Sequence, residues 1–156
     1  MTHNFEIRLR WRKTHPTERE IGGYYSHESI LTADKHAALV ASAAGAFGGD
    51  TRLWNPEELL MAAIAQCHML SFLYAAHQSS IEIFDYVDET RGTMEYQGGS
   101  GAMTSVTLRP TIETNASPAD IDRLHEEAKA MCVLRASVNF PIHVDSVTAP
   151  PAATIN

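Results

Sequence analysis

The chain has 156 residues, enough to bury a hydrophobic core, and we expect a single domain over residues 1–156. Its net charge of −7 argues against a nucleic acid or an anionic membrane as the main partner, since both require a basic face. The amino-terminal sequence lacks the apolar segment of a secretion signal, so we expect a cytoplasmic protein. Two cysteines in such a reducing compartment are more often buried small residues or a redox pair than a structural disulfide.

The first part of the chain predicts two strands and a loop. Apolar residues alternate with charged ones from Phe5 to Trp11, as in a strand with one buried and one solvated face. Residues 15–23 are turn-like, and residues 24–31 predict a second strand. Small residues dominate positions 37–49, which we expect to form a loop with room for one helical turn.

Residues 55–78 predict a long helix at the centre of the core. Asn55 can cap the helix, Pro56 suits its first position and Glu58 completes a capping box. Apolar residues then occur on nearly every side, so the helix must be surrounded by protein or lipid. Polar residues interrupt the apolar run, which favours the core of a soluble protein over a membrane span. Cys67 lies in the middle of this helix.

A β-hairpin is predicted after this helix. Residues 81–96 contain many β-forming residues in imperfect alternation, which is typical of a bulged strand. Residues 97–101 predict a turn, and residues 106–112 alternate as a second strand. Pro110 favours an edge position for that strand, because proline cannot donate a ladder hydrogen bond.

The last part of the chain predicts a helix, a strand and a tail. Ser117 and Pro118 begin a helix over about residues 117–134, and its apolar face includes Cys132. Residues 138–144 alternate as a final strand, and residues 149–156 predict a loose tail. The order of elements predicts an α+β fold with antiparallel strands.

Considered as residues alone, both cysteines fit inert core positions, because free cysteine is among the most buried residue types. Cys67 lies too far from the helix N-terminus to be activated by the helix dipole, so a reactive thiolate would need a cation from another segment. The neighbouring His68 has no partner at a metal-binding spacing. We therefore predict no metal site, and a satisfied polar contact for each histidine.

Two motifs resemble the OsmC/Ohr family of bacterial peroxidases. The first combines Asn55-Pro56-Glu57-Glu58-Leu59-Leu60 with Ala65-Gln66-Cys67-His68, and the second is Cys132-Val133-Leu134-Arg135-Ala136-Ser137-Val138. With the lead-in from Gly49 and the Leu108-Arg109-Pro110 segment, the resemblance covers roughly residues 40–148. It implies an OsmC-like fold in which the two central helices pack with antiparallel strands and two chains intertwine as a homodimer.

The resemblance also implies site roles. Cys67 would be the peroxidatic thiol and Cys132 the resolving thiol, with an external dithiol as reductant and no bound cofactor. Glu57 would be the carboxylate that holds a thiolate-stabilising arginine. Ten residues of helix span about 15 Å, so Glu57 would serve a site completed by a partner subunit. Three residues are candidates for the activating cation, namely Arg19, Arg52 and His27.

Three functional hypotheses follow. The first is a thiol-dependent peroxidase that reduces organic hydroperoxides to alcohols through a Cys67 sulfenate and a Cys67–Cys132 disulfide, in defence against oxidative stress. The second is a non-catalytic OsmC-like dimer that binds an apolar small molecule and whose cysteines are inert. The third is an unrelated α+β protein with two chance cysteines.

Overall fold

A computed structural model describes residues 1–12 and 25–151. The chain forms two compact units, residues 1–60 and 61–156, and helix α1 (Pro56–Gln78) begins in the first and continues in the second. The turn predicted over residues 15–23, the start of the strand predicted over residues 24–31, and Arg19 all lie outside the described residues.

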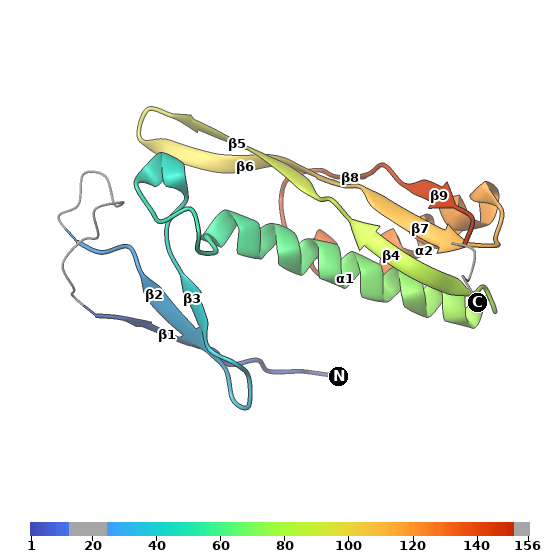
Figure 1. The fold of residues 1–156 in the computed structure, drawn as a ribbon, viewed down its shortest axis with the longest axis horizontal. Coiled ribbons are helices and arrows are strands. Elements are labelled where there is room, and N and C mark those ends of the chain that lie inside the picture. Colours follow the sequence, from blue (N-terminus) through green and yellow to red (C-terminus); the bar gives the residue numbers. More distant parts are fainter. Residues whose placement is uncertain (13–24, 152–156) are drawn as a thin grey trace, which may run out of the picture. The chain divides into compact units, whose positions relative to one another are not determined.

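The first unit contains a three-stranded antiparallel sheet of β1 (Arg8–Trp11), β2 (Ser29–Thr32) and β3 (Leu39–Ala41), in that order (Figure 1). The loop prediction for residues 37–49 was therefore partly wrong, because β3 pairs with the open edge of β2. The helical turn allowed there is the 3-10 helix η1 (Gly45–Phe47). The burial predicted for one face of β1 was also wrong, since Leu9 and Trp11 are 64% and 48% exposed in the single chain.

The second unit contains two three-stranded sheets. One has the order β4-β7-β9 and the other β5-β6-β8 (Figure 1). The bounds of the strands are β4 Ile83–Asp88, β5 Arg91–Gln97, β6 Ser100–Leu108, β7 Pro110–Thr114, β8 Ile142–Val144 and β9 Val147–Ala149. The predicted hairpin is β5–β6, and its turn contains Gly98 and Gly99 with positive φ of 62° and 85°.

The single bulged strand predicted over residues 81–96 is in fact two strands, β4 and β5. A side chain stabilises the break between them: Asp88 Oδ1 accepts hydrogen bonds from the Arg109 N–H (2.8 Å) and the Thr90 hydroxyl (2.9 Å). Register shifts remain inside both strands, as expected for bulges.

Two strand predictions need correction. Pro110 lies on the central strand β7 rather than on an edge, but it is the first residue of that strand, where a missing N–H is tolerated. The strand predicted over residues 138–144 is reduced to β8. Both β8 and β9 pair in parallel with β6 and β7, so the sheets are mixed rather than wholly antiparallel.

Both predicted helices are present with their predicted caps. The Glu58 N–H donates to Asn55 Oδ1 (2.9 Å) and the Asn55 N–H donates to Glu58 Oε2 (3.4 Å), which completes the capping box. Helix α2 (Pro118–Met131) starts after Ser117, whose hydroxyl accepts from the Asp120 N–H. It ends three residues earlier than predicted because Cys132 adopts an extended conformation, and the 3-10 helix η2 (Arg135–Ser137) follows.

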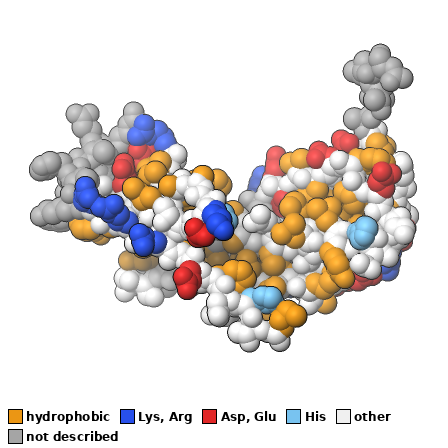
Figure 2. All heavy atoms as spheres, turned by 90° about the horizontal axis from the view of Figure 1, so that it is seen from below, with side chains coloured by type: hydrophobic (Ala, Val, Ile, Leu, Met, Phe, Trp, Pro, Cys, Tyr) orange, Lys and Arg blue, Asp and Glu red, His pale blue; other side chains and the backbone are white. Residues whose placement is uncertain are grey.

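The core of the second unit lies between α1, α2 and β7. Its buried cluster contains Phe72, Ala75, Ala76, Ile112, Ile121, Leu124 and Ala128. Helix α1 is long and apolar enough to cross a membrane by length and composition, with a mean hydropathy of 1.6. It packs here as a core helix, yet Leu70 and Tyr74 are 56% and 57% exposed. Hydrophobic side chains accordingly gather on the surface seen in Figure 2. A large part of the apolar surface of α1 is therefore uncovered in one chain.

We predict that Gly49→Ala destabilises the first unit, because a Cβ at Gly49 would lie 1.9 Å from the backbone oxygen of Ala43. The expected cost is about 3 kcal/mol, or a fall in Tm of roughly 6–12 °C. Thermal unfolding followed by circular dichroism measures it. Gly98→Asn is the control, since Gly98 has open space around its Cβ position and asparagine tolerates its φ of 62°. Equal Tm values for the two variants would contradict the prediction.

Candidate functional site

The second unit brings the two cysteines together. Cys67 is half-buried on α1 and Cys132 is 3% exposed just beyond the end of α2, and both are free thiols. The two thiols lie close enough for Cys67 to raise the pKa of Cys132, although 65 positions separate them in the sequence. Two cysteines that lie close together in a fold are candidates for a disulfide.

Cys132 lies in an enclosed environment with opposing influences on its thiol. Burial is the largest influence and raises the pKa of Cys132, and the nearby Cys67 raises it further. The backbone N–H groups of Arg135 and Leu134 hydrogen-bond the sulfur and lower the pKa in part. Burial prevails, so Cys132 is kept as a protonated thiol.

Cys67, by contrast, opens onto a cavity of about 330 Å³. The other lining residues are Leu70, Ser71, Tyr74 and Met131. The Ser71 hydroxyl donates to the backbone carbonyl of Cys67 (2.9 Å), so its proton is directed to the helix backbone rather than into the cavity. The walls are otherwise apolar side chains with one phenol. This cavity can hold an alkyl or aryl group next to the Cys67 sulfur.

The remaining predicted site residues belong to the first unit. Glu57 is half-buried in the first turn of α1, and its Oε2 is buried without a hydrogen-bond partner among the described residues. Arg52 donates to both carboxylate oxygens of the buried Asp50, and this contact raises the pKa of Arg52. The ring of His27 contacts that of Tyr25 at 5.0 Å.

Sequence reasoning missed a buried histidine pair next to the cysteines. His68 Nε2 and His125 Nδ1 are 3.0 Å apart and share a hydrogen bond between α1 and α2. Their rings are stacked, and His125 also contacts Phe72. Burial is the main cause that lowers the pKa of each histidine to about 4, and nearby cations add to the effect. The pair is therefore neutral at pH 7. The satisfied polar contact predicted for His68 is confirmed, but its partner could not be identified from spacing.

Arg135 is a second residue whose position the sequence did not reveal. One guanidinium nitrogen donates to the backbone oxygen of Ile142 at 2.7 Å, which ties η2 to the start of β8. Its charge contributes to lowering the pKa of His68. The Arg135 guanidinium, held by this hydrogen bond, is therefore a cation close enough to act on the histidine pair.

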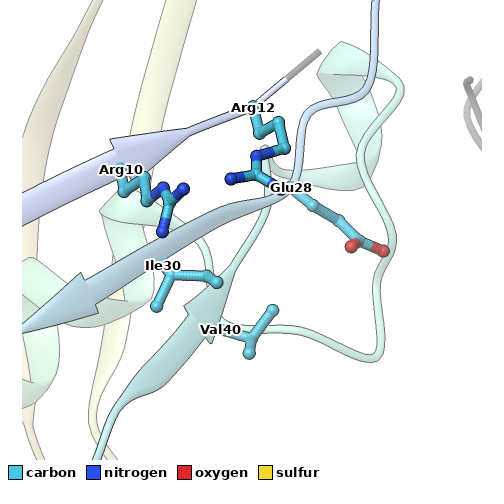
Figure 3. Close-up of a pocket in the computed structure, with 5 residues that line it drawn as sticks. All are labelled: Arg10, Arg12, Glu28, Ile30 and Val40. Atoms are coloured by element: carbon cyan, nitrogen blue, oxygen red, sulfur yellow. The ribbon is translucent and has the colours of Figure 1, made fainter. Parts of the chain in front are cut away.

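A separate cavity of about 340 Å³ lies on the sheet of the first unit (Figure 3). Arg10, Ile30 and Val40 are register partners across β1, β2 and β3, and Arg12 and Glu28 complete the lining. Figure 3 shows the two guanidinium groups above Ile30, without any thiol or other nucleophile among the lining residues. Of these two cavities, only the Cys67 cavity has a thiol among its lining residues.

The described elements define an α+β protein with one cysteine in the middle of a long apolar helix and a second just after the next helix. A sequence model of OsmC-like proteins matches residues 48–147, and the chain belongs to this family. No curated protein is similar enough to count as a match.

Solved structures agree with this assignment. An OsmC-like protein of unknown function from Vibrio cholerae is 22% identical, with a TM-score of 0.82 over 94% of this chain and 100% of that chain. An organic hydroperoxide resistance protein from Elizabethkingia anophelis is 16% identical, with a TM-score of 0.68 over 97% and 100%. One from Bacillus subtilis is 18% identical, with a TM-score of 0.64 over 94% and 98%. These similarities confirm the predicted α+β fold.

We predict that the histidine pair makes stability depend on pH. The unfolded chain binds these protons below about 6.5, whereas the folded chain does so only near 4, so stability falls as the pH drops through this window. Urea unfolding between pH 7.5 and 4.5 measures the loss. The double variant His68→Gln/His125→Asn should show a flatter pH dependence, because it lacks both groups. Parallel curves for the two proteins would contradict the prediction.

Proposed function

We propose that this protein is a thiol-dependent peroxidase that reduces organic hydroperoxides to alcohols. The observation that carries the proposal is the proximity of an accessible thiol, Cys67, at an apolar cavity, to a buried thiol, Cys132. The names of the Elizabethkingia and Bacillus relatives, organic hydroperoxide resistance proteins, support the same class of substrate.

In the first step the Cys67 thiolate attacks the terminal oxygen of the hydroperoxide. A sulfur–oxygen bond forms, the oxygen–oxygen bond breaks, and the alkoxide takes a proton from water to leave as the alcohol. The alkyl group of the substrate would lie against Leu70, Tyr74 and Met131. Cys67 is left as a sulfenic acid.

In the second step Cys132 attacks the sulfur of that sulfenic acid. A disulfide forms and the sulfur–oxygen bond breaks, and the departing hydroxide takes the Cys132 proton and leaves as water. The proximity of the thiols supports an intrachain disulfide. An external dithiol then reduces it by thiol–disulfide exchange, so no bound cofactor is required.

The proposed site is completed in a homodimer. The uncovered apolar surface of α1 gives a second subunit a hydrophobic surface to bury. The buried Glu57 Oε2 lacks a hydrogen-bond partner in the described chain, and a cation supplied across the interface would satisfy it. That cation would also hold Cys67 of the other subunit as a thiolate. In this proposal Glu57 positions the cation and does not touch the peroxide.

We expect reduced protein to form the Cys67–Cys132 disulfide within seconds of adding a slight excess of cumene hydroperoxide. Intact-mass measurement follows the loss of two hydrogens. Cys132→Ser should accumulate a sulfenic acid that dimedone traps, and Cys67→Ser should not react. Cumene hydroperoxide should react at least ~10-fold faster than hydrogen peroxide, because burial of an apolar group contributes about 1.5–3 kcal/mol.

Unchanged wild-type mass on that timescale would remove the peroxidase proposal. It would favour instead the hypothesis of an OsmC-like dimer that binds an apolar molecule in the Cys67 cavity.

We expect two inactive variants to restore activity when mixed, because the site draws Cys67 and Glu57 from different subunits. Cys67→Ser and Glu57→Gln should each lack peroxidase activity as pure proteins, at about twice the chain mass by light scattering. After joint unfolding and refolding, about a quarter of wild-type sites should return, since random mixing makes half of the dimers hybrid with one complete site each.

Glu58→Gln is the matched control for this experiment. Glutamine also completes a capping box, so this variant should be active alone. A monomeric protein, or no activity after mixing, would contradict the shared site.

A further inference from the structure

The hydrogen bond between His68 and His125 is a buried polar connection between α1 and α2. A second hydrogen bond, from Arg123 on α2 to Ser79 just after α1, is exposed. His68 follows Cys67 directly on α1, and His125 lies seven positions before Cys132, the residue that follows the last turn of α2. The histidine pair therefore joins the two helices that carry or precede the cysteines.

The surroundings of the pair specify the register of the helices less sharply than a hydrogen bond does. The buried cluster around it consists of apolar side chains, among them Phe72, Ala75, Leu124 and Ala128. The hydrophobic effect that holds such groups together is not directional. A hydrogen bond of 3.0 Å between two rings is directional, and it fixes one register.

Stability is a poor explanation for the pair. Both rings are buried, at 1% and 3% exposure, and His125 Nε2 has no hydrogen-bond partner among the described residues. An unpaired buried nitrogen costs free energy that two apolar side chains of similar size would avoid. Buried polar groups of this kind are retained in some proteins because they specify one arrangement of the core.

Burial keeps the pair neutral, and the charged groups around it act in both directions. Lys129 on α2 and Arg135 on η2 oppose a proton on these rings, whereas Asp122 and Glu126 on α2 favour one at His125. On the strand side Phe72 separates His125 from the buried phenol of Tyr86. With both rings neutral, one facing nitrogen donates its hydrogen and the other accepts it, which preserves the hydrogen bond.

We propose that the His68–His125 hydrogen bond is a positioning contact that holds α1 and α2 in the register in which the Cys67 and Cys132 sulfur atoms lie close together. It thereby sets how favourable the Cys67–Cys132 disulfide is. This inference rests on the proposed two-cysteine function, but it concerns the disulfide equilibrium and not the reaction with peroxide. His68 and His125 are positioning residues and touch no substrate.

The test measures the equilibrium between the protein dithiol and oxidised dithiothreitol, which yields the protein disulfide and reduced dithiothreitol. Acid-quenched samples are separated by mass after alkylation, so no peroxide is needed. His125→Leu should lower the equilibrium constant at least tenfold while Tm stays the same or rises. His125→Asn should remain within about threefold of wild type, because its amide occupies the position of Nδ1.

A second pair of variants tests the other side of the bond. His68→Leu should behave like His125→Leu, and His68→Gln should be close to wild type because its amide occupies the position of Nε2. His77→Leu, an exposed histidine in the last turn of α1, is the control and should change nothing.

Three outcomes would overturn the inference. They are a wild-type constant in both leucine variants, equal losses in the leucine and amide variants, and a loss that appears only together with a fall in Tm. If the wild-type protein does not react with peroxide, the proposed function is wrong. The equilibrium constants would still show whether the His68–His125 bond favours the disulfide.

Discussion

Helices α1 and α2 share one buried cluster, in which the small side chains of Ala75, Ala76 and Ala128 lie among larger apolar ones. This shared core brings Cys132, one residue beyond the last turn of α2, near a thiol in the middle of α1. Larger residues at these positions would separate the helices and with them the two sulfur atoms. The proximity of the two thiols therefore depends on packing between helix residues that carry no reactive group.

The same helix α1 also leaves apolar surface and one carboxylate oxygen without partners in the described chain. A helix that is apolar on every side needs cover on every side, but its own chain covers only the face that meets α2 and β7. At its start, a buried carboxylate oxygen of Glu57 has no hydrogen-bond partner in the described chain. An apolar surface and an unsatisfied anion on one helix are the two deficits that a second subunit would remove together.

Local signals in the sequence were sufficient for the helices and insufficient for the strand breaks. Asn55, Glu58 and Ser117 cap helices through bonds within four residues, so their roles are visible in the sequence. The break after Asp88 depends on a hydrogen bond from Arg109, 21 positions away, and no periodicity reveals it. The His68–His125 bond joins residues 57 positions apart and was missed for the same reason.

For the cysteines, too, the sequence pattern predicted some features, whereas others depend on the packing of the folded chain. The helical position of Cys67 was predictable from apolar periodicity, whereas Cys132, predicted within a helix, lies one residue beyond it. Their proximity was implied only by the resemblance to a family. Their unequal exposure became visible only in the folded chain, because it depends on the cavity that Leu70, Tyr74 and Met131 form around Cys67.

This unequal exposure assigns an order to the proposed reaction. A hydroperoxide in the cavity meets Cys67 first, because Cys132 is enclosed by protein. In the proposed reaction, Cys132 would lie close to the oxidised Cys67 and would need no path to solvent. The external dithiol would approach from the same cavity, so its sulfur would reach Cys67 and Cys132 would be the leaving thiolate. The backbone N–H groups of Arg135 and Leu134 point to that sulfur and would stabilise the charge as it forms. A single opening thus serves oxidation and reduction, and the buried thiol acts only through its neighbour.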